Sequence, residues 1–260
     1  MSTRSMYVWR LRNVINAEGS VQRIVDKAKR AKLSALWIKI ADGQSKFENV
    51  AGDLEDKFKD LVTRAHDKSI EVWGWQVPHA PDEVAAQKEA ALLGDLAHQF
   101  GLDGLIMDAE GGAAFFQGGV SEAIAYGLAA RQAADNLGKP LGISSNDIPQ
   151  NIAGWLPKFN EIAKQAILNF PQTYYGASPS VQSRVDKAAT ANAHLSIPFI
   201  PVGAGFLGTA DGGCASASDC AARAATFMDL CETRGYEGYS YWHWAGAPMA
   251  LWETLNTTPV

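Results

Sequence analysis

The sequence predicts a single (β/α)8 barrel spanning residues 1–260, on three observations. Short apolar runs of strand length alternate with amphipathic segments of helical period along the whole chain. No linker-like stretch interrupts this alternation, and the 260 residues are close to the usual barrel length of about 250. The glycine-rich loop G-x-G-x-x-G of a doubly wound open sheet does not occur, since "GAGFLG" at 203–208 lacks its spacing.

The eight strands are expected where apolar, β-branched and aromatic residues cluster. In chain order they are 6–11, 35–40, 70–77, 104–109, 141–146, 166–174, 198–205 and 238–244. Apolar residues at i, i+3, i+4 and i+7 predict helices between them. These are 20–32, 53–68, 82–100, 119–137, 155–165, 181–194 and 218–234, followed by a terminal helical pattern around Trp252. A helix after each strand is the arrangement that a barrel requires.

Asp108 and Glu110 follow the apolar run of the fourth expected strand, in the stretch "GLDGLIMDAEGG". Residues two apart on a strand point to the same side, with Cα atoms about 6–7 Å apart. Functional groups of a barrel collect where its strands end, so both carboxylates are expected to face the barrel mouth. Because burying ionised carboxylates is costly unless they are paired or used, two interpretations stay open. The acids are a catalytic pair, or they form an ion pair with Lys39 or a first-strand arginine and merely fill the barrel.

Polar and aromatic side chains gather at the other strand ends. Sugar rings stack on aromatic faces, and their hydroxyl groups bond to amides and carboxylates, so these residue types favour a carbohydrate site. The candidate glycan-binding residues are Asp42, Trp75, Gln76, Asp147, Gln172, Tyr175 and Trp244. We expect one groove across the barrel face to be lined by Trp75, Gln172, Tyr174 and Trp244, beside the two acids.

The stretch "LDGLIMDAEGG" resembles the fourth-strand signature D-G-x-D-x-D-x-E of the family 18 chitinases. Asp103, Gly104, Asp108 and Glu110 match that signature, and Ile106 stands where the family has its first interior Asp. The resemblance implies a glycoside hydrolase on a barrel.

The layout of residues 35–112 also resembles the family 25 lysozymes. In those proteins a K-A-T-E-G strand end, a Y-H-F strand end, a helix with a Q-A pair and D-x-E follow one another. This chain has "WIKIADGQSKFEN", "WGWQVPHAPDEVAAQKEA" and "LIMDAEGG" in the same order. The lysozymes also carry an Asp at the end of strand one and another after strand six, where this chain has "YVWRLRN" and "PQTYYG".

The expected general acid is Glu110, because its side chain is the longer and lies further toward the mouth, and Asp108 is its partner. A like charge so close should raise the pKa of one of the two. The resemblance implies that Asp108, with Tyr174 or Tyr175, holds the 2-acetamido group of a β-linked N-acetylhexosamine, as in peptidoglycan or chitin; of the two tyrosines we take Tyr174 as the candidate. On a substrate without that group, Asp147 or Asp42 would supply a second carboxylate.

Three alternatives to this function remain. The chain could be a non-catalytic glycan-binding barrel, or a glycosidase that acts on a different polysaccharide. A metal-dependent hydrolase would need ligands converging on the mouth, where His79 and His243 are the best placed histidines. Neither a metal nor a cofactor is expected, since no C-x-x-C and no Cys/His cluster occurs.

Composition and charge limit the classes of molecule that the protein is expected to bind. The net charge of −5 provides no basic surface, so a polysaccharide is expected and a nucleic acid is not. No apolar run approaches the length of a membrane span. The start "MSTRSMYVWRLRN" lacks the apolar core of a signal peptide, so we expect export only through a removed leader or another route.

The three cysteines leave one question open. Cys214 and Cys220, in "GGCASASDC", either form a disulfide or stay reduced in a Gly/Ser/Ala loop. Cys231 shares a helical stripe with Ala224, Phe227 and Met228 and is expected in the core.

Overall fold

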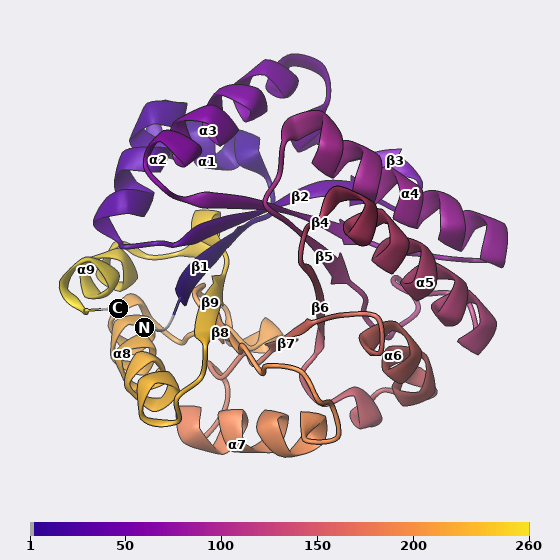
Figure 1. The fold of residues 1–260 in the computed structure, drawn as a ribbon. Coiled ribbons are helices and arrows are strands. Elements are labelled where there is room, and N and C mark those ends of the chain that lie inside the picture. Colours follow the sequence, from indigo (N-terminus) through magenta and orange to yellow (C-terminus); the bar gives the residue numbers. More distant parts are fainter. Residues whose placement is uncertain (1–2, 260) are drawn as a thin grey trace.

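The computed structural model describes residues 3–259, which form a ring of eight parallel strands with helices around it (Figure 1). The strands are β1 (Thr3–Val8), β2 (Ala35–Asp42), β4 (Glu71–Val77), β5 (Gly104–Asp108), β6 (Leu141–Asn146), β7 (Leu168–Gln172), β8 (Val202–Ala204) and β9 (Gly238–Trp242). Hydrogen-bonded neighbours follow the order β7-β6-β5-β4-β2-β1-β9-β8, and a parallel bridge between Asn169 and Phe199 closes the ring. All eight expected strands take part, which confirms the predicted barrel.

The helices lie where the periodicity places them, with one addition. They are α1 (Leu11–Glu18), α2 (Val21–Arg30), α3 (Glu55–Asp67), α4 (Glu83–Phe100), α5 (Val120–Leu137), α6 (Trp155–Ala163), α7 (Val181–Asn192), α8 (Ala217–Thr233) and α9 (Met249–Thr257). A short strand β3 (Ser45–Lys46) pairs antiparallel with the end of β2. Within residues 3–259, no helix combines the length and apolar character needed to cross a membrane.

Helix α1 was not predicted, because the first strand was expected to run to residue 11. The strand ends at Val8 instead, and α1 begins at Leu11. The backbone N–H of Leu11 donates to Asn49 Oδ1 at 2.7 Å. This side chain, 38 positions later in the chain, satisfies one of the donors that the start of a helix leaves free. A contact between such distant residues leaves no trace in the local sequence.

Each strand separates two apolar layers. On β5, Leu105 and Met107 face outward and pack beneath the helices, whereas Ile106 faces inward. The barrel interior is filled mainly by aromatic residues of several strands, among them Tyr7, Trp37, Trp73, Trp75 and Phe170. The inward residues at the carboxyl ends of the strands therefore lie above an aromatic floor, at the face where barrel sites form.

Candidate active site

Asp108 and Glu110 project to the same side at the mouth of the barrel. Ala109 between them packs into the outer layer beneath the helices, so the two acids continue the inward direction of Ile106. Asp108 is only 4% exposed, and Glu110, further toward the solvent, is partly exposed. The expectation that both carboxylates face the barrel mouth is confirmed in geometry.

Two side-chain amides from neighbouring strands hold the acids. Gln172 of β7 donates from Nε2 to Asp108 Oδ1 at 3.1 Å. Asn146 of β6 donates from Nδ2 to Glu110 Oε2 at 3.3 Å. The orientation of Asn146 is fixed because its Oδ1 accepts the backbone N–H of Gly111 at 2.9 Å. Strands β6 and β7 therefore each fix one carboxyl group of the pair.

The surroundings of the two acids raise their pKa values to different extents. Burial raises the pKa of Asp108 to about 6, against the opposing effects of the Ser144 hydroxyl, the Lys39 charge and the Gln172 amide. Burial, and after it the negative charge of Asp108, raises the pKa of Glu110 to about 8. The pair titrates as a unit. At neutral pH the pair therefore retains one proton, and Glu110 has the more strongly raised pKa of the two.

The cations that could have neutralised the acids have other partners. Lys39 Nζ lies 2.8 Å from Asp42 Oδ2, and Asp42 Oδ1 lies 2.6 Å from His79 Nε2. The arginines that follow β1 pair elsewhere: Arg10 with Glu48 and Arg12 with Asp53. Within residues 3–259, no ion pair joins Lys39 or these arginines to Asp108 or Glu110. The acids are therefore not a barrel-filling ion pair, and Asp42 serves as the partner of Lys39 and His79.

A cavity of about 440 Å³ opens between the loops that follow β6, β7 and β8. Its walls include Asn146 and Gln172, the two amides bonded to the acids, together with Tyr174. Burial raises the pKa of Tyr174 well above its ordinary value, and the charges of Glu110 and then Asp108 add to this effect. The Tyr174 phenol therefore lies within the electrostatic field of both carboxylates.

Asp147 lies in the wall of the same cavity. Its carboxylate Oδ1 is 2.6 Å from Arg184 Nη2 of α7, and only 4% of the residue is exposed. Burial raises the pKa of Asp147 to about 6, although the Arg184 charge acts in the opposite direction. Of the predicted glycan contacts, Asp147 and Gln172 therefore lie at the cavity, while Asp42 is on the Lys39 side of the mouth.

Two predicted contacts on β4 are wrong because the structure buries them. Trp75 points inward but lies too deep, is 1% exposed, and donates its indole N–H to the Trp37 carbonyl at 3.1 Å. Gln76 points outward beneath α4, where its amide donates to the carbonyls of Gly43 and Glu89 at 3.0 and 2.8 Å. Neither side chain reaches the barrel mouth.

Tyr175 and Trp244 are also wrong as glycan contacts, since both pack on the outer side of the strands. The Tyr175 ring is fully buried, with its centre 5.1 Å from that of Phe227 in α8. Trp244 is buried against Trp252 of α9, with ring centres 4.6 Å apart, and donates its indole N–H to Glu18. The predicted groove therefore keeps Gln172 and Tyr174 and loses both of its tryptophans.

Trp242, not Trp244, is the tryptophan that β9 presents to the site. It ends the strand, is partly exposed, and packs against the rings of Tyr7 and Trp75 at 5.5 and 5.7 Å. Its peptide bond to His243 is cis. Trp9, 40% exposed at the end of β1, lies 6.3 Å from the Trp242 ring. These two indoles give the mouth an aromatic surface. Trp242 lies two positions after Ser240, which is buried and faces inward, so the alternation of side chains along a strand points Trp242 inward as well.

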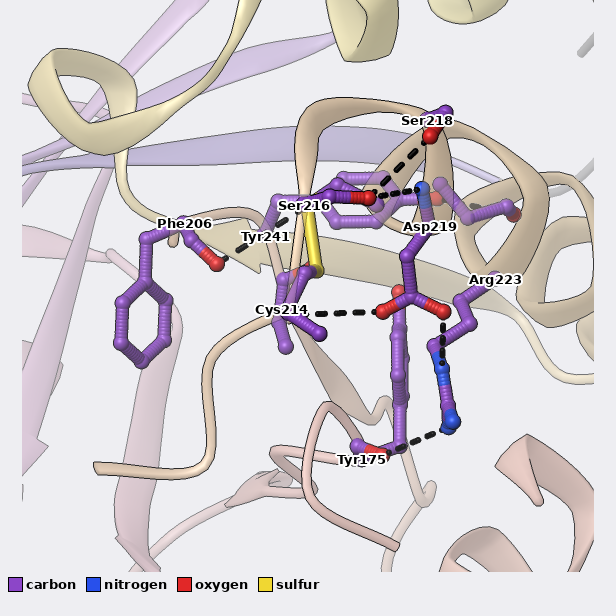
Figure 2. The surroundings of a disulfide bond; sticks show 12 residues. Tyr175, Phe206, Cys214, Ser216, Ser218, Asp219, Arg223 and Tyr241 are labelled. Carbon is purple, nitrogen blue, oxygen red and sulfur yellow. Dashed lines mark hydrogen bonds and ion pairs between the residues drawn. A yellow bond between two sulfur atoms is a disulfide. The ribbon is translucent and has the colours of Figure 1, made fainter. Parts of the chain in front are cut away.

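Cys214 and Cys220 form a disulfide, which settles the question that the sequence left open. The bond joins the loop after β8 to the first turns of α8 (Figure 2). The same loop contains residues 209–212 of the cavity wall. Figure 2 also shows Arg223, which binds Asp219 and donates to the carbonyl of Tyr175 at 3.0 Å. The disulfide and Arg223 together fix two loops of the cavity to α8.

No protein-family model and no curated protein sequence matches this chain. Solved structures match it along nearly its whole length. A GH18 chitinase from Pseudoalteromonas aurantia matches with a TM-score of 0.68 at 12% identity, covering 96% of this chain and 97% of that chain. An endo-β-N-acetylglucosaminidase from Cordyceps militaris matches with a TM-score of 0.64 at 16% identity, covering 99% and 91%.

A spore cortex-lytic enzyme from Bacillus megaterium has a TM-score of 0.65 at 11% identity, covering 98% of this chain and 73% of that chain. At these identities the similarity establishes the fold. The matches agree with the family 18 part of the sequence resemblance and do not bear on the family 25 part.

Proposed function

We propose that the protein is a glycoside hydrolase that cleaves a β-linked N-acetylhexosamine glycan of the chitin or peptidoglycan type. The observation that carries the proposal is the acid pair: Asp108 and Glu110 project to the same side at the barrel mouth, where burial raises the pKa of both carboxyl groups. Glycoside cleavage needs one group that donates a proton and one that stabilises positive charge in the transition state. The D-G-x-x-x-D-x-E resemblance and the fold of the compared structures support this interpretation.

The proposed first step moves one proton and exchanges one bond. Glu110 donates its proton to the glycosidic oxygen while the bond between that oxygen and the anomeric carbon breaks. The carbonyl oxygen of the substrate's acetamido group bonds to the anomeric carbon. Asp108 accepts a hydrogen bond from the acetamido N–H and balances the developing positive charge, and the Tyr174 hydroxyl orients the acetamido carbonyl.

The proposed second step restores the enzyme. Glu110, now ionised, takes a proton from a water molecule that attacks the anomeric carbon, and the acetamido oxygen leaves. The cavity between the loops after β6, β7 and β8 is lined by Asn146 and Gln172, the two amides bonded to the acids, and it is our candidate for the space that holds a sugar ring. Peptidoglycan stays in the proposal because of the family 25 resemblance and because one compared structure bears the name of a cortex-lytic enzyme.

Hydrolysis of three substrates tests this function. We expect cleavage of chitin oligosaccharides or of purified peptidoglycan, and no cleavage of chitosan oligosaccharides, which lack the acetyl group that forms the new bond. Products are separated by chromatography and identified by mass. Cleavage of chitosan at an equal rate would contradict the acetamido route. Binding of the N-acetylated glycans without any product would instead support the alternative of a non-catalytic glycan-binding barrel.

A further inference from the structure

Lys39 occupies an inward position on β2 at the barrel mouth. Its neighbours Ile38 and Ile40 both pack in the outer layer, so Lys39 faces the interior. In the register of the sheet, Lys39 lies opposite Trp75 of β4, and Trp75 lies opposite Ile106 of β5. Lys39 therefore starts at the level just below Asp108, and its long side chain extends over the Trp75 ring, with Nζ 5.2 Å from the ring centre.

The ammonium group of Lys39 is buried, with 7% of the side chain exposed, and Asp42 is its ion-pair partner at 2.8 Å. Asp42 is 39% exposed at its side chain and also bonds to His79, so its negative charge is shared and partly hydrated. The positive charge of Lys39 consequently also acts on the acid pair: it lowers the pKa of both Asp108 and Glu110, against the effect of burial.

The other groups that face the acids are neutral or negative. Tyr7 of β1 and Tyr174 of the β7 loop are phenols whose pKa values are raised by burial and by the two carboxylates. Asp147 beyond Tyr174 is paired with Arg184. Directly below Asp108, Ile106 offers neither a proton nor a hydrogen bond. Among residues 3–259, Lys39 is the cation whose charge bears on both acids.

We propose that Lys39 is a positioning residue of the acid pair: its buried ammonium, anchored by Asp42 in the layer below Asp108, is the positive charge that favours the ionised form of the deeper acid, Asp108. This inference rests on the proposed function. Lys39 touches neither acid directly, and it acts through the field that it creates in a poorly hydrated site.

The variant Lys39→Met tests the proposal, since it keeps the length of the side chain and removes the charge. Both carboxyl groups then lose a favourable partner, and we expect their pKa values to rise by roughly one unit. The rate requires ionised Asp108 and protonated Glu110, so both limbs of the pH–rate profile should move to higher pH. Lys39→Arg retains the charge and should bring both limbs back toward those of the wild type. Lys46→Met, at an exposed lysine of β3, is the matched control and should leave the profile unchanged.

A carbon-detected NMR titration of the Asp108 and Glu110 carboxyl groups gives the same answer without any substrate. If no glycan is cleaved but the carboxyl titrations of Lys39→Met shift upward, the proposed function fails while the electrostatic role of Lys39 stands. Unchanged titrations, or an activity loss that is equal at every pH, would overturn the role of Lys39. If Lys39→Met does not fold, Lys39→Gln, whose amide can still donate to Asp42, is titrated in its place.

Discussion

Asp108 and Glu110 carry the same charge when ionised, yet their surroundings assign them different roles. Asp108 lies deeper, but Ser144, Lys39 and Gln172 all stabilise its ionised form. Glu110 is partly exposed, but burial still raises its pKa, and the negative charge of Asp108 beside it opposes a second ionisation. The division into acid and partner follows from these contacts and not from the two side chains themselves.

The first prediction at this scale concerns the pH dependence of the rate. Activity should rise with pH as Asp108 ionises near pH 6 and fall as Glu110 loses its proton near pH 8, which gives a bell-shaped profile with its maximum between them. Initial rates on a chitin oligosaccharide in buffers of constant ionic strength check this. A rate that keeps rising above pH 8 would show that the acid form of Glu110 is not required.

Single residues at the mouth were predictable only in part. The two-residue period of a strand is local, so the shared direction of Asp108 and Glu110 could be read from their spacing. The sequence does not show which set of alternating residues faces inward, or how deep each one lies. Gln76 was therefore placed on the wrong side and Trp75 at the wrong depth, while Trp242 was passed over for Trp244.

At the scale of elements, the loop after β8 depends on a covalent constraint. The backbone N–H of Cys214 donates to the Phe206 carbonyl at 2.7 Å, and the disulfide fixes this loop to the start of α8. The Gly212 carbonyl of this loop accepts the backbone N–H of Gly176, so the loop also supports the segment that carries Tyr174. The disulfide thus positions one wall of the cavity.

Replacing Cys214 and Cys220 by Ala should weaken substrate binding more than it slows the chemical step. The acids lie on β5 and not on this loop, so we expect KM to rise severalfold while kcat changes little. Closing a loop of six residues contributes about 2 kcal/mol to the free energy of unfolding, so Tm should fall modestly. Cys231→Ala is the matched control, because this buried thiol is unpaired and away from the loop. A double variant with wild-type KM would contradict the role of the disulfide.

Strand limits also show where element prediction fails. The seventh expected strand, 198–205, shrinks to Val202–Ala204 in β8. Pro198 and Pro201 lack the backbone N–H that strand pairing needs, so regular pairing begins only after them. Apart from the first strand, which lies three residues earlier than expected, the other strands agree closely with the prediction, because their β-branched and aromatic runs are bounded by polar residues or glycine.

At the scale of the whole molecule, the fold depends on the pattern of apolar and polar positions along the chain and not on which particular residue occupies each position. The chain shares only 12% of its residues with the Pseudoalteromonas structure, but the two agree with a TM-score of 0.68 over 96% of this chain. Alternating strands and helices, with an outer apolar layer and an inner aromatic one, are sufficient to specify the barrel. The barrel then brings Lys39, Asp108, Asn146, Gln172 and Trp242, from five strands, to one face.

The central claim, that this face holds a general acid at Glu110, is tested most directly by the variant Glu110→Gln. The amide keeps the shape and can still bond to Asn146, but it has no proton to transfer. We predict that kcat on a chitin oligosaccharide falls at least about a hundredfold. Tm at neutral pH should stay the same or rise, because within residues 3–259 Glu110 has no ion-pair partner to lose, and its repulsion with Asp108 disappears. A Glu110→Gln protein that cleaves the glycan at the wild-type rate, or that is strongly destabilised while remaining active, would contradict the account.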